Sequence, residues 1–592
     1  MAQQKLATFP LSLTKITFPR ERKTSSQVMR SAKVSWATQC KASYNVHSQT
    51  IFRRSANYQP SIWTFDYIQS LNTEYKEEIY TQRVRVLREE VRMLLCKVES
   101  ELDQLEFTDA LQRLGVDYHY DHEIRKFLDD IFKMNTLNEE NDLYATTLKF
   151  RLLRQHGYNI SSDVFIRFKD DKGNLKKDHT LDVKGMLSLY EASFHSFEDE
   201  TILDEAKDFT SKFLKEYWTE EKGNNYTSLL INHALELPLH WRNPRWETQW
   251  FINVYERKEN MIPTLLQLAK LNFNIAQAIY LEELKESSRW WKRVGLGEKC
   301  SFARDRLVEN YVWTVGANSH PDLEYYRKSM TKINSLITII DDIYDVYGTF
   351  EELKLFTEVI GSWDLNAMDS LPNYMKTCFQ ALNNIVNEIA CENQEKNGYN
   401  ITAYLIKTWA DLCKSYFIEA KWYYSEYMPS LEEYLGNAWI SISTPLQLIH
   451  TYFLIPHSIN MEELNNMEKY SDIIQFSAMI SRLANDLGTY KRENEMGDVA
   501  KSIQCYMNES GASEVEAREY LKSVMYKTWK KMNEATYNCS FSQCFISTTV
   551  NLTNMALCMY QRGDGHTIQD PEIKSRILSL VIKPIPLTYT KK

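Results

Sequence analysis

Residues 332–345 read Lys332-Ile333-Asn334-Ser335-Leu336-Ile337-Thr338-Ile339-Ile340-Asp341-Asp342-Ile343-Tyr344-Asp345. The part before Asp341 is mostly apolar and contains no glycine or proline, which predicts a buried helix. Asp341 and Asp345 are four residues apart, so both carboxylates project from one face at the end of that helix. Like charges at this spacing destabilise a helix unless a cation offsets them, and hard divalent cations bind carboxylate oxygens. We therefore expect a metal site here, with a solvated acidic helix end as the alternative.

A second polar pattern follows about 140 residues downstream. It reads Arg482-Leu483-Ala484-Asn485-Asp486-Leu487-Gly488-Thr489-Tyr490-Lys491-Arg492-Glu493. Asn485, Thr489 and Glu493 recur every four residues, so their oxygen atoms share one helical face over two turns. They form a usable ligand set for Mg²⁺, although a polar helix surface would show the same pattern.

The rest of the chain also has helical periodicity. From about residue 60 onward, apolar residues recur at spacings of three and four, and strand-like alternation is rare. The 592 residues include only 17 glycines and 14 prolines, which leaves room for long helices. We predict an all-α protein with an amino-terminal helical domain over residues 53–265. Because the polar motifs cluster after about residue 300, we expect a catalytic helical domain over residues 266–592.

Composition excludes several classes of partner. The formal net charge of −9 disfavours binding to nucleic acid or to an anionic membrane surface. No apolar run reaches the 18 or more residues that a membrane span requires. The ten cysteines are scattered without a C-x-x-C pair, which is typical of free thiols in a reducing compartment. Nothing in the sequence indicates an obligate protein partner.

The first fifty residues differ from the rest of the chain. They contain eight lysines or arginines, thirteen serines or threonines, and one acidic residue, Glu21. This composition, without a compact apolar segment, is typical of an organellar transit peptide, which we place at residues 1–52. A disordered tail is the alternative. Composition does not separate a plastid from a mitochondrial destination.

The pair of motifs, D-D-x-x-D and N-D-x-x-T-x-x-x-E, resembles the class I terpene synthases of plants. The resemblance runs from Arg53 to the carboxyl end and includes four further stretches: Arg-Gln-His-Gly-Tyr at 154–158, Ser-Arg-Trp-Trp at 288–291, Phe-Ala-Arg-Asp-Arg at 302–306 and Gly-Asp-Gly-His at 563–566. It implies that the carboxy-terminal domain is a class I terpenoid synthase helical barrel and the amino-terminal domain a vestigial helical barrel. In this family the two motifs face each other and bind three Mg²⁺ around a substrate diphosphate; Mn²⁺ can replace Mg²⁺.

The resemblance also implies roles for individual residues. The expected metal ligands, with Asp342 in support, are Asp341, Asp345, Asn485, Thr489 and Glu493. The expected diphosphate contacts are Arg304, Arg482 and Lys501, together with Asp341, Asp345 and Asn485. Aromatic wall positions, whose faces can stabilise a carbocation, are matched by Trp313, Tyr416 and Tyr560. Each of these aromatic residues would, by itself, also suit a simple apolar core.

The start of the matching region resembles one subgroup of the family. Arg53 and Arg54 precede Trp63 by eight intervening residues, as in the R-R-x8-W element of angiosperm plastid monoterpene synthases. In that subgroup the segment caps the closed active site. The basic end of a transit peptide is the alternative reading of the two arginines. Together with the leader, the element favours a plastid enzyme that uses geranyl diphosphate. The amino-terminal domain lacks D-x-D-D, the general-acid motif of protonation-initiated cyclases, which favours a structural role.

The resemblance implies a monoterpene synthase that ionises geranyl diphosphate to an acyclic or cyclic product of the ocimene, myrcene, linalool, limonene or terpineol type. Isoprene-forming members carry phenylalanines where this chain has Asn334 and Ser481, so the wall should admit ten carbons. A sesquiterpene or hemiterpene synthase is the nearest alternative. An elongating prenyl diphosphate synthase would carry a second D-D-x-x-D in place of Asn485 to Glu493. A non-catalytic helical scaffold is the alternative from another class.

Overall fold

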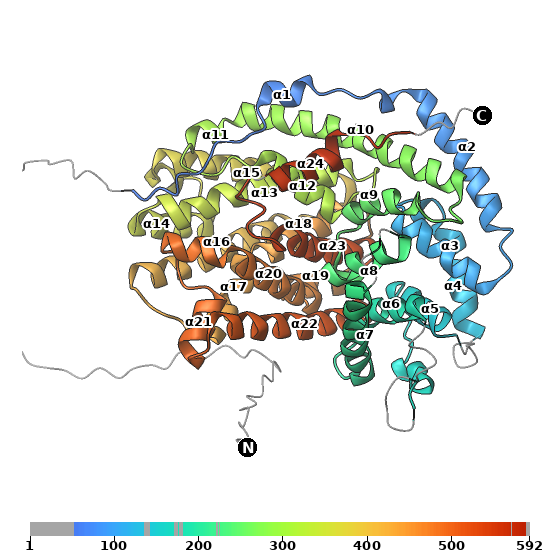
Figure 1. Ribbon diagram of the computed structural model, residues 1–592. Coiled ribbons are helices and arrows are strands. Elements are labelled where there is room, and N and C mark those ends of the chain that lie inside the picture. Colours follow the sequence, from blue (N-terminus) through green and yellow to red (C-terminus); the bar gives the residue numbers. More distant parts are fainter. Residues whose placement is uncertain are drawn as a thin grey trace, which may run out of the picture. The chain divides into compact units, whose positions relative to one another are not determined.

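Figure 1 shows a computed structural model of the chain, which describes residues 53–134, 142–170, 176, 182–220, 223, 225–569 and 571–587. The expected transit segment, residues 1–52, lies outside the described residues. The regular elements of the described part are helices, and none of them is a β-strand. The prediction of an all-α fold is confirmed.

The described helices before residue 260 are α1 (Phe65–Ser70), α2 (Glu78–Leu95), α3 (Glu101–Arg113), α4 (Asp121–Met134), α5 (Leu143–Gln155), α6 (Val183–Ser193), α7 (Thr201–Glu220), α8 (Tyr226–Glu236) and α9 (Pro244–Tyr255). Those that follow are α10 (Pro263–Val294), α11 (Leu296–Lys299), α12 (Leu307–Ala317), α13 (Glu324–Asp342), α14 (Phe350–Ser362), α15 (Asn373–Asn397), α16 (Thr402–Tyr424), α17 (Leu431–Ser441), α18 (Thr444–Leu454), α19 (Met461–Glu468), α20 (Asp472–Met496), α21 (Ser502–Ser510), α22 (Glu514–Asn538), α23 (Gln543–Tyr560) and α24 (Pro571–Ile577). Short 3₁₀ or π turns are η1 (Glu74–Lys76), η2 (Asp117–His119), η4 (Ser162–Phe168), η6 (Leu239–Trp241), η7 (Ile343–Tyr347), η8 (Ala367–Ser370) and η9 (Leu578–Ile582).

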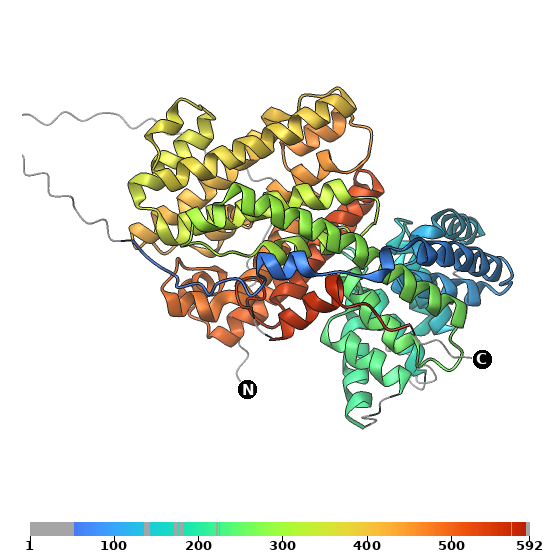
Figure 2. The same cartoon turned by 90° about the horizontal axis from the view of Figure 1, so that it is seen from above.

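The long helix α10 contacts elements from both ends of the described chain. It begins at Pro263, whose missing N–H and fixed φ suit the first helical turn. It ends at Gly295, which has a φ of 69° and adopts this left-handed conformation without strain. α10 contacts α1 and α2 and also α12 and α13. Figure 2 shows α1 lying against α10.

The apolar core does not separate at residue 265. One large cluster contains Leu111 from α3 together with Val312 from α12 and Met555 from α23. A second cluster lies among α13 to α18 and includes Ile340 and Trp409. The predicted domain boundary falls in the first turn of α10, and a division there stays a prediction.

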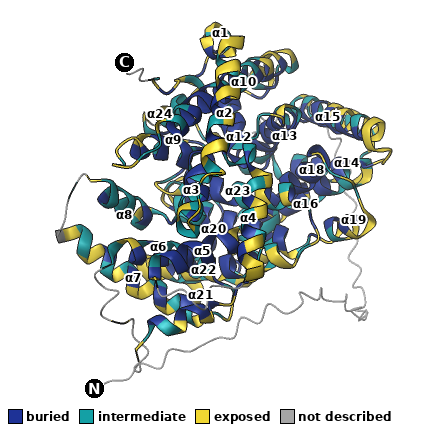
Figure 3. Ribbon diagram, turned by 90° about the vertical axis from the view of Figure 1, so that its right-hand side faces the viewer, coloured by how far each residue is buried: buried dark blue, intermediate teal, exposed yellow. Residues whose placement is uncertain are grey.

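Burial places the two motif-bearing helices inside the molecule. α13 is buried along most of its length and α20 along much of its length, whereas α1 and one face of α15 are exposed (Figure 3). None of the helices in the described part combines the length and the apolar character that crossing a membrane requires. Polar side chains on buried helices need hydrogen-bond partners or ligands. We therefore expect the functional site at the ends of α13 and α20.

Candidate active site

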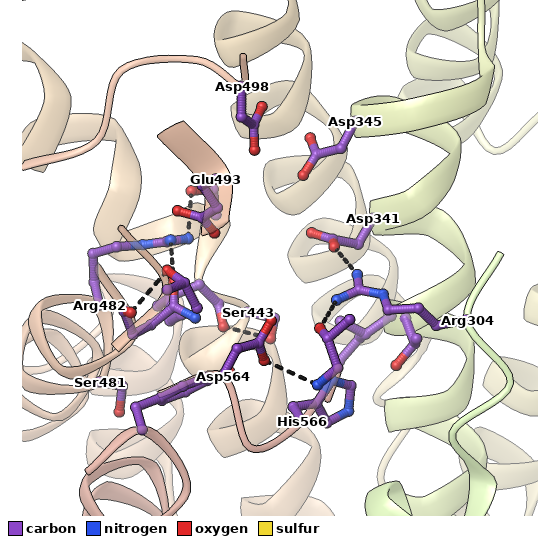
Figure 4. Close-up of a pocket in the computed structure, with 18 of the residues that line it drawn as sticks. Arg304, Asp341, Asp345, Ser443, Ser481, Arg482, Glu493, Asp498, Asp564 and His566 are labelled. Carbon is purple, nitrogen blue, oxygen red and sulfur yellow. Dashed lines mark hydrogen bonds and ion pairs between the residues drawn. The ribbon is translucent and has the colours of Figure 1, made fainter. Parts of the chain in front are cut away.

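A cavity of about 190 Å³ lies between α13 and α20, with walls from α12, α16, α18 and α23. Figure 4 shows its polar end, where Asp341 and Asp345 face Glu493 and Arg482 from the opposite side. Most of the site residues expected from the sequence line this cavity: Arg54, Arg304, Trp313, Asn334, Asp341, Asp345, Tyr416, Ser481, Arg482, Asn485, Thr489, Glu493, Lys501 and Tyr560. The structure thus brings together two motifs that lie about 140 residues apart in the sequence.

The first motif lies where α13 ends and the π turn η7 begins. The helix reaches Asp342, and the next five residues, with Asp345 among them, form the wider turn. Both Asp341 and Asp345 still reach the cavity, as the spacing predicts. Burial raises the pKa of the Asp345 carboxyl well above its usual range, and the neighbouring carboxylates of Asp341 and Asp498 raise it further. A bound cation would reverse this penalty.

Asp342 has a different position from its two neighbours. Its side chain is fully buried and is not among the described residues that line the cavity. It accepts hydrogen bonds from the backbone N–H of Arg304 at 2.7 Å and from Arg304 Nε at 3.0 Å. Arg304 also forms an ion pair with Asp341 and donates to Thr567 Oγ1 at 3.1 Å. Asp342 therefore holds the arginine that points into the site.

The second motif lies on α20. Asn485, Thr489 and Glu493 all line the cavity, in agreement with their shared helical face. Thr489 donates its hydroxyl proton to the backbone carbonyl of Asn485 at 2.9 Å, which leaves its oxygen lone pairs free. One carboxylate oxygen of Glu493, Oε2, is buried and has no hydrogen-bond partner among the described residues. Burial raises the pKa of Glu493 to about 7.

Two buried, positively charged side chains lie beside the second motif. Arg482 donates to Asn485 Oδ1 at 2.9 Å and to Ser441 Oγ at 3.1 Å. Lys501 precedes the first turn of α21, and its Nζ lies 3.6 Å from Glu419 Oε2. Burial opposes the charge on Lys501, yet the surrounding carboxylates raise its pKa well above the usual value. Both side chains are held charged and turned toward the cavity.

Asp486 is a buried carboxylate to which the sequence assigned no role. It is fully buried and accepts hydrogen bonds from the Tyr434 hydroxyl at 3.0 Å and from the backbone N–H of Ser502 at 3.2 Å. Its carboxylate also lies 3.4 Å from Arg482 Nη1. Asp486 thereby fixes both Arg482 and the start of α21, next to Lys501. In the sequence, Asp486 stands beside the predicted ligand Asn485 and looks equivalent to it, whereas in the structure it is fully buried and is not among the described residues that line the cavity.

The segment before α1 contributes Arg54 and Tyr58 to the lining of the cavity. Arg53 forms two hydrogen bonds to the Glu352 carboxylate, at 2.7 and 2.8 Å, and the guanidinium of Arg54 lies 4.0 Å from the ring centre of Tyr423. Trp63 is buried and donates from Nε1 to Glu309 Oε1 at 3.1 Å. Of the three capping residues predicted from the sequence, only Arg54 lines the cavity itself. Arg53 and Trp63 anchor the two ends of the segment.

Tyr58, within the same segment, reaches the site and was not singled out by the sequence. Its ring lies 5.3 Å from the guanidinium carbon of Arg304 and 5.7 Å from that of Arg492. Burial raises the pKa of the Tyr58 hydroxyl, and the nearby carboxylate of Asp342 raises it further. Tyr58 therefore covers two guanidinium groups as a neutral aromatic residue.

The deeper wall is partly aromatic. Trp313 and Tyr560 have ring centres 6.0 Å apart, and Tyr416 lines the cavity from α16. His566, another residue that sequence reasoning missed, contacts Trp313 edge-on at 6.1 Å. Burial and the nearby Arg304 lower the pKa of His566 to about 3, so this imidazole is neutral at ordinary pH.

Comparisons with known proteins agree with this geometry. The family model described as "Terpene synthase, N-terminal domain" matches residues 62–235, and "Terpene synthase family, metal binding domain" matches residues 292–531. The chain is 53% identical over 545 residues to a chloroplastic myrcene synthase of Quercus ilex, which covers 91% of each chain. The chain belongs to the terpene synthase family.

Solved structures of other terpene synthases have the same fold. A limonene synthase in complex with 2-fluorolinalyl diphosphate is 43% identical, with a TM-score of 0.88 over 90% of this chain and 100% of that one. An isoprene synthase of grey poplar, in complex with three Mg²⁺ ions and dimethylallyl-S-thiolodiphosphate, is 44% identical, with a TM-score of 0.82 over 89% of this chain and 99% of that one. The expected class I terpenoid synthase fold is confirmed.

The side chains of this terpene synthase fit divalent cations. Within the described residues no three histidine, cysteine, aspartate or glutamate side chains form a group that could hold a metal ion. A cation would instead find mixed sets of carboxylate, amide and hydroxyl oxygens on α20 and a pair of carboxylates on α13 and η7. The unpaired Oε2 of Glu493 and the raised pKa of Asp345 are the features that a cation would satisfy.

Proposed function

We propose that this terpene synthase is a monoterpene synthase that ionises geranyl diphosphate with Mg²⁺ and converts the resulting carbocation to a ten-carbon terpene. The observation that carries the proposal is the convergence of Asp341 and Asp345 with Asn485, Thr489 and Glu493 around one cavity. The names of its relatives, which include myrcene and limonene synthases, support a C10 substrate.

The polar end of the cavity would bind the diphosphate. Arg304, Arg482 and Lys501 are charged, buried or half-buried, and held in place by carboxylates, so they need little reorganisation when the substrate arrives. When bound, three Mg²⁺, or Mn²⁺ in their place, would neutralise the charge that collects on the leaving diphosphate. Fixed cations stabilise that charge more in the transition state than in the ground state, which accelerates C–O cleavage.

The deeper part would bind the hydrocarbon chain. Trp313, Tyr416 and Tyr560 offer aromatic faces to a carbocation and carry no strong nucleophile. Asn334 on α13 and Ser481 on α20 also line the cavity and are smaller than phenylalanine, which leaves space for ten carbons. The segment from Arg53 to Trp63 would exclude bulk water while the cation exists.

Relatives named chloroplastic support a plastid location, with removal of residues 1–52. Residues 53–265 would support the catalytic helices of residues 266–592 and supply the capping segment. No protein partner, nucleic acid or membrane is part of the proposal.

Incubation of the purified chain with geranyl diphosphate and Mg²⁺ tests the proposal, with volatiles identified by mass spectrometry. A ten-carbon terpene that forms only when divalent metal is present would support it. The same assay with dimethylallyl diphosphate tests the hemiterpene synthase alternative, and with farnesyl diphosphate it tests the sesquiterpene synthase alternative. Addition of isopentenyl diphosphate tests whether the enzyme elongates prenyl diphosphates. Longer diphosphates in that last assay, or no turnover of any prenyl diphosphate, would contradict the proposal.

A further inference from the structure

Arg492 lines the same cavity as the two acidic motifs, and the proposed function gives it no role. It lies on α20, three residues after Thr489 and seven after Asn485, so these three side chains share one helical face. The Arg492 side chain is 28% exposed, so an anion that enters the cavity can reach it. A positive charge therefore lies on the same face of α20 as two of the proposed metal ligands.

The ion pair that Arg492 forms uses one side of its guanidinium group. Nη1 donates to Asp564 Oδ2 at 2.7 Å. Nε and Nη2 form another edge of the planar group and donate to none of the described residues. That edge carries two parallel N–H donors, which is the arrangement that binds two oxygens of a phosphate or carboxylate group.

Two of the other arginines that line the cavity have no such free edge. Each of the three nitrogens of Arg304 donates a hydrogen bond within the protein, and so does each nitrogen of Arg482. Arg54, a further arginine of the lining, lies against the ring of Tyr423. Arg492 thus differs from Arg304 and Arg482 in having a pair of donors available to a ligand.

One loop and one aromatic ring connect Arg492 with Arg304. Asp564 Oδ1 accepts a hydrogen bond from the backbone N–H of Thr567 at 2.9 Å, and Thr567 Oγ1 accepts one from Arg304 Nη1 at 3.1 Å. The ring centre of Tyr58 lies 5.7 Å from the guanidinium carbon of Arg492 and 5.3 Å from that of Arg304. Two guanidinium groups held beside one ring repel each other, and an anion that contacts both would offset this repulsion.

We propose that Arg492 is a further diphosphate-binding residue, which donates from Nε and Nη2 to oxygens of the substrate diphosphate while Asp564 holds Nη1. The inference rests on the proposed function and adds this residue to Arg304, Arg482 and Lys501. A guanidinium edge matches a pair of phosphate oxygens better than an ammonium group does.

Calorimetry of inorganic diphosphate binding to the full chain, with Mg²⁺ present, tests this role without requiring turnover. Arg492→Gln should raise the dissociation constant about tenfold, because it removes a pair of charge-assisted hydrogen bonds. Arg492→Lys keeps the charge but loses the paired donors, so it should raise the constant about threefold. The inhibition constant of inorganic diphosphate against geranyl diphosphate should rise by the same factors. The second variant keeps the proposal testable if the first does not fold.

Two further variants separate anion binding from a structural role. Lys491→Gln removes the same charge one residue earlier on α20, from an exposed side chain outside the described lining, and should leave the dissociation constant unchanged. Asp564→Asn breaks the ion pair but keeps Arg492, and should change the constant less than twofold. Equal effects of Asp564→Asn and Arg492→Gln would show that Arg492 acts by holding the loop, which would overturn the proposal.

Three other outcomes are decisive. An unchanged dissociation constant in Arg492→Gln would overturn the assignment, as would the absence of diphosphate binding by the unmodified chain. Diphosphate binding that depends on Arg492, without turnover of geranyl diphosphate by the unmodified chain, would support this inference and contradict the proposed function.

Discussion

Arg53 and Glu352, 299 positions apart in the sequence, form a two-point ion pair next to Arg54, which lines the cavity. The guanidinium also lies 4.5 Å from the ring centre of Tyr347 and donates to its backbone carbonyl at 3.0 Å. Paired hydrogen bonds between a planar guanidinium and a carboxylate resist rotation better than a lysine contact would. The pair ties the capping segment to α14, just beyond the first acidic motif.

Arg53→Ala should loosen the capping segment. We expect kcat/KM for geranyl diphosphate to fall about tenfold and early-quenched acyclic products to increase, because water gains access to the cation. Product profiles and steady-state kinetics measure both effects. Arg83→Ala, which removes an exposed arginine 3.9 Å from Glu90, is the control and should change neither. An unchanged product profile in Arg53→Ala would contradict the capping role.

The ion pair between Arg53 and Glu352 predicts that docking of the capping segment depends on pH. Burial tends to raise the pKa of Glu352, but its hydrogen bonds with Arg53 and the backbone of Thr349 lower it to about 2. The unfolded or undocked carboxyl has a pKa of about 4.3, so the stabilisation is complete above that value and is lost as pH falls toward 2. Allowing for solvent screening, we expect about 1 kcal/mol of docking free energy to be lost. Hydrogen exchange of the segment between pH 5 and pH 2.5, corrected for intrinsic exchange rates, measures it. Glu352→Gln should abolish this dependence.

Asp341→Ala should nearly abolish catalysis. The loss of a proposed metal ligand weakens stabilisation of the departing diphosphate, and we expect turnover to fall about 10³-fold. Diphosphate release measures it, and removal of metal by a chelator should have the same effect on the unmodified enzyme. Circular dichroism should show an intact fold, since the Asp341 side chain is 27% exposed at the end of its helix. Near-normal turnover would refute the two-motif metal site.

Asn334 and Ser481 should set the chain length of the substrate. Asn334→Phe combined with Ser481→Phe fills part of the cavity with two bulky side chains. It should shift the substrate preference from geranyl toward dimethylallyl diphosphate. Each buried methylene contributes about 0.8 kcal/mol, so a C5 chain binds weakly in a cavity sized for ten carbons. Competition between the two substrates measures the ratio. A specificity constant of the unmodified enzyme that is highest for a C5 or C15 substrate would contradict this pocket assignment.

Asp486→Asn should destabilise the fold as well as the site. It leaves the buried Arg482 without its fully buried carboxylate partner, and breaking such a pair costs about 3 kcal/mol. Urea unfolding measures the free energy of unfolding. Glu514→Gln, which removes one partner of the surface pair with Arg518, is the control and should change stability by less than about 0.5 kcal/mol. Equal stability of the two variants would show that Asp486 has no such structural role.

The sequence by itself determined the helical fold and the two polar faces. Helical register is a local property, so the spacing of Asp341 and Asp345, and of Asn485, Thr489 and Glu493, was enough to predict that each set reaches one face. The family motifs then pointed to the residues that would meet across the cavity. The same reasoning assigned Arg53, Arg54 and Trp63 a shared capping role.

Only the tertiary structure decided which of these residues touch the cavity and what holds them. Asp342 turns inward to Arg304, and Asp486 to Arg482, although in the sequence each stands next to a proposed ligand. Tyr58 reaches Arg304 because the segment that bears it is anchored at Glu352 and Glu309. The contacts of Arg53, Tyr58 and Trp63 join residues more than 200 positions apart, and their partners depend on the packing of whole helices. Burial, which separates a structural carboxylate from a metal ligand, is a property of that packing and has no signature in local spacing.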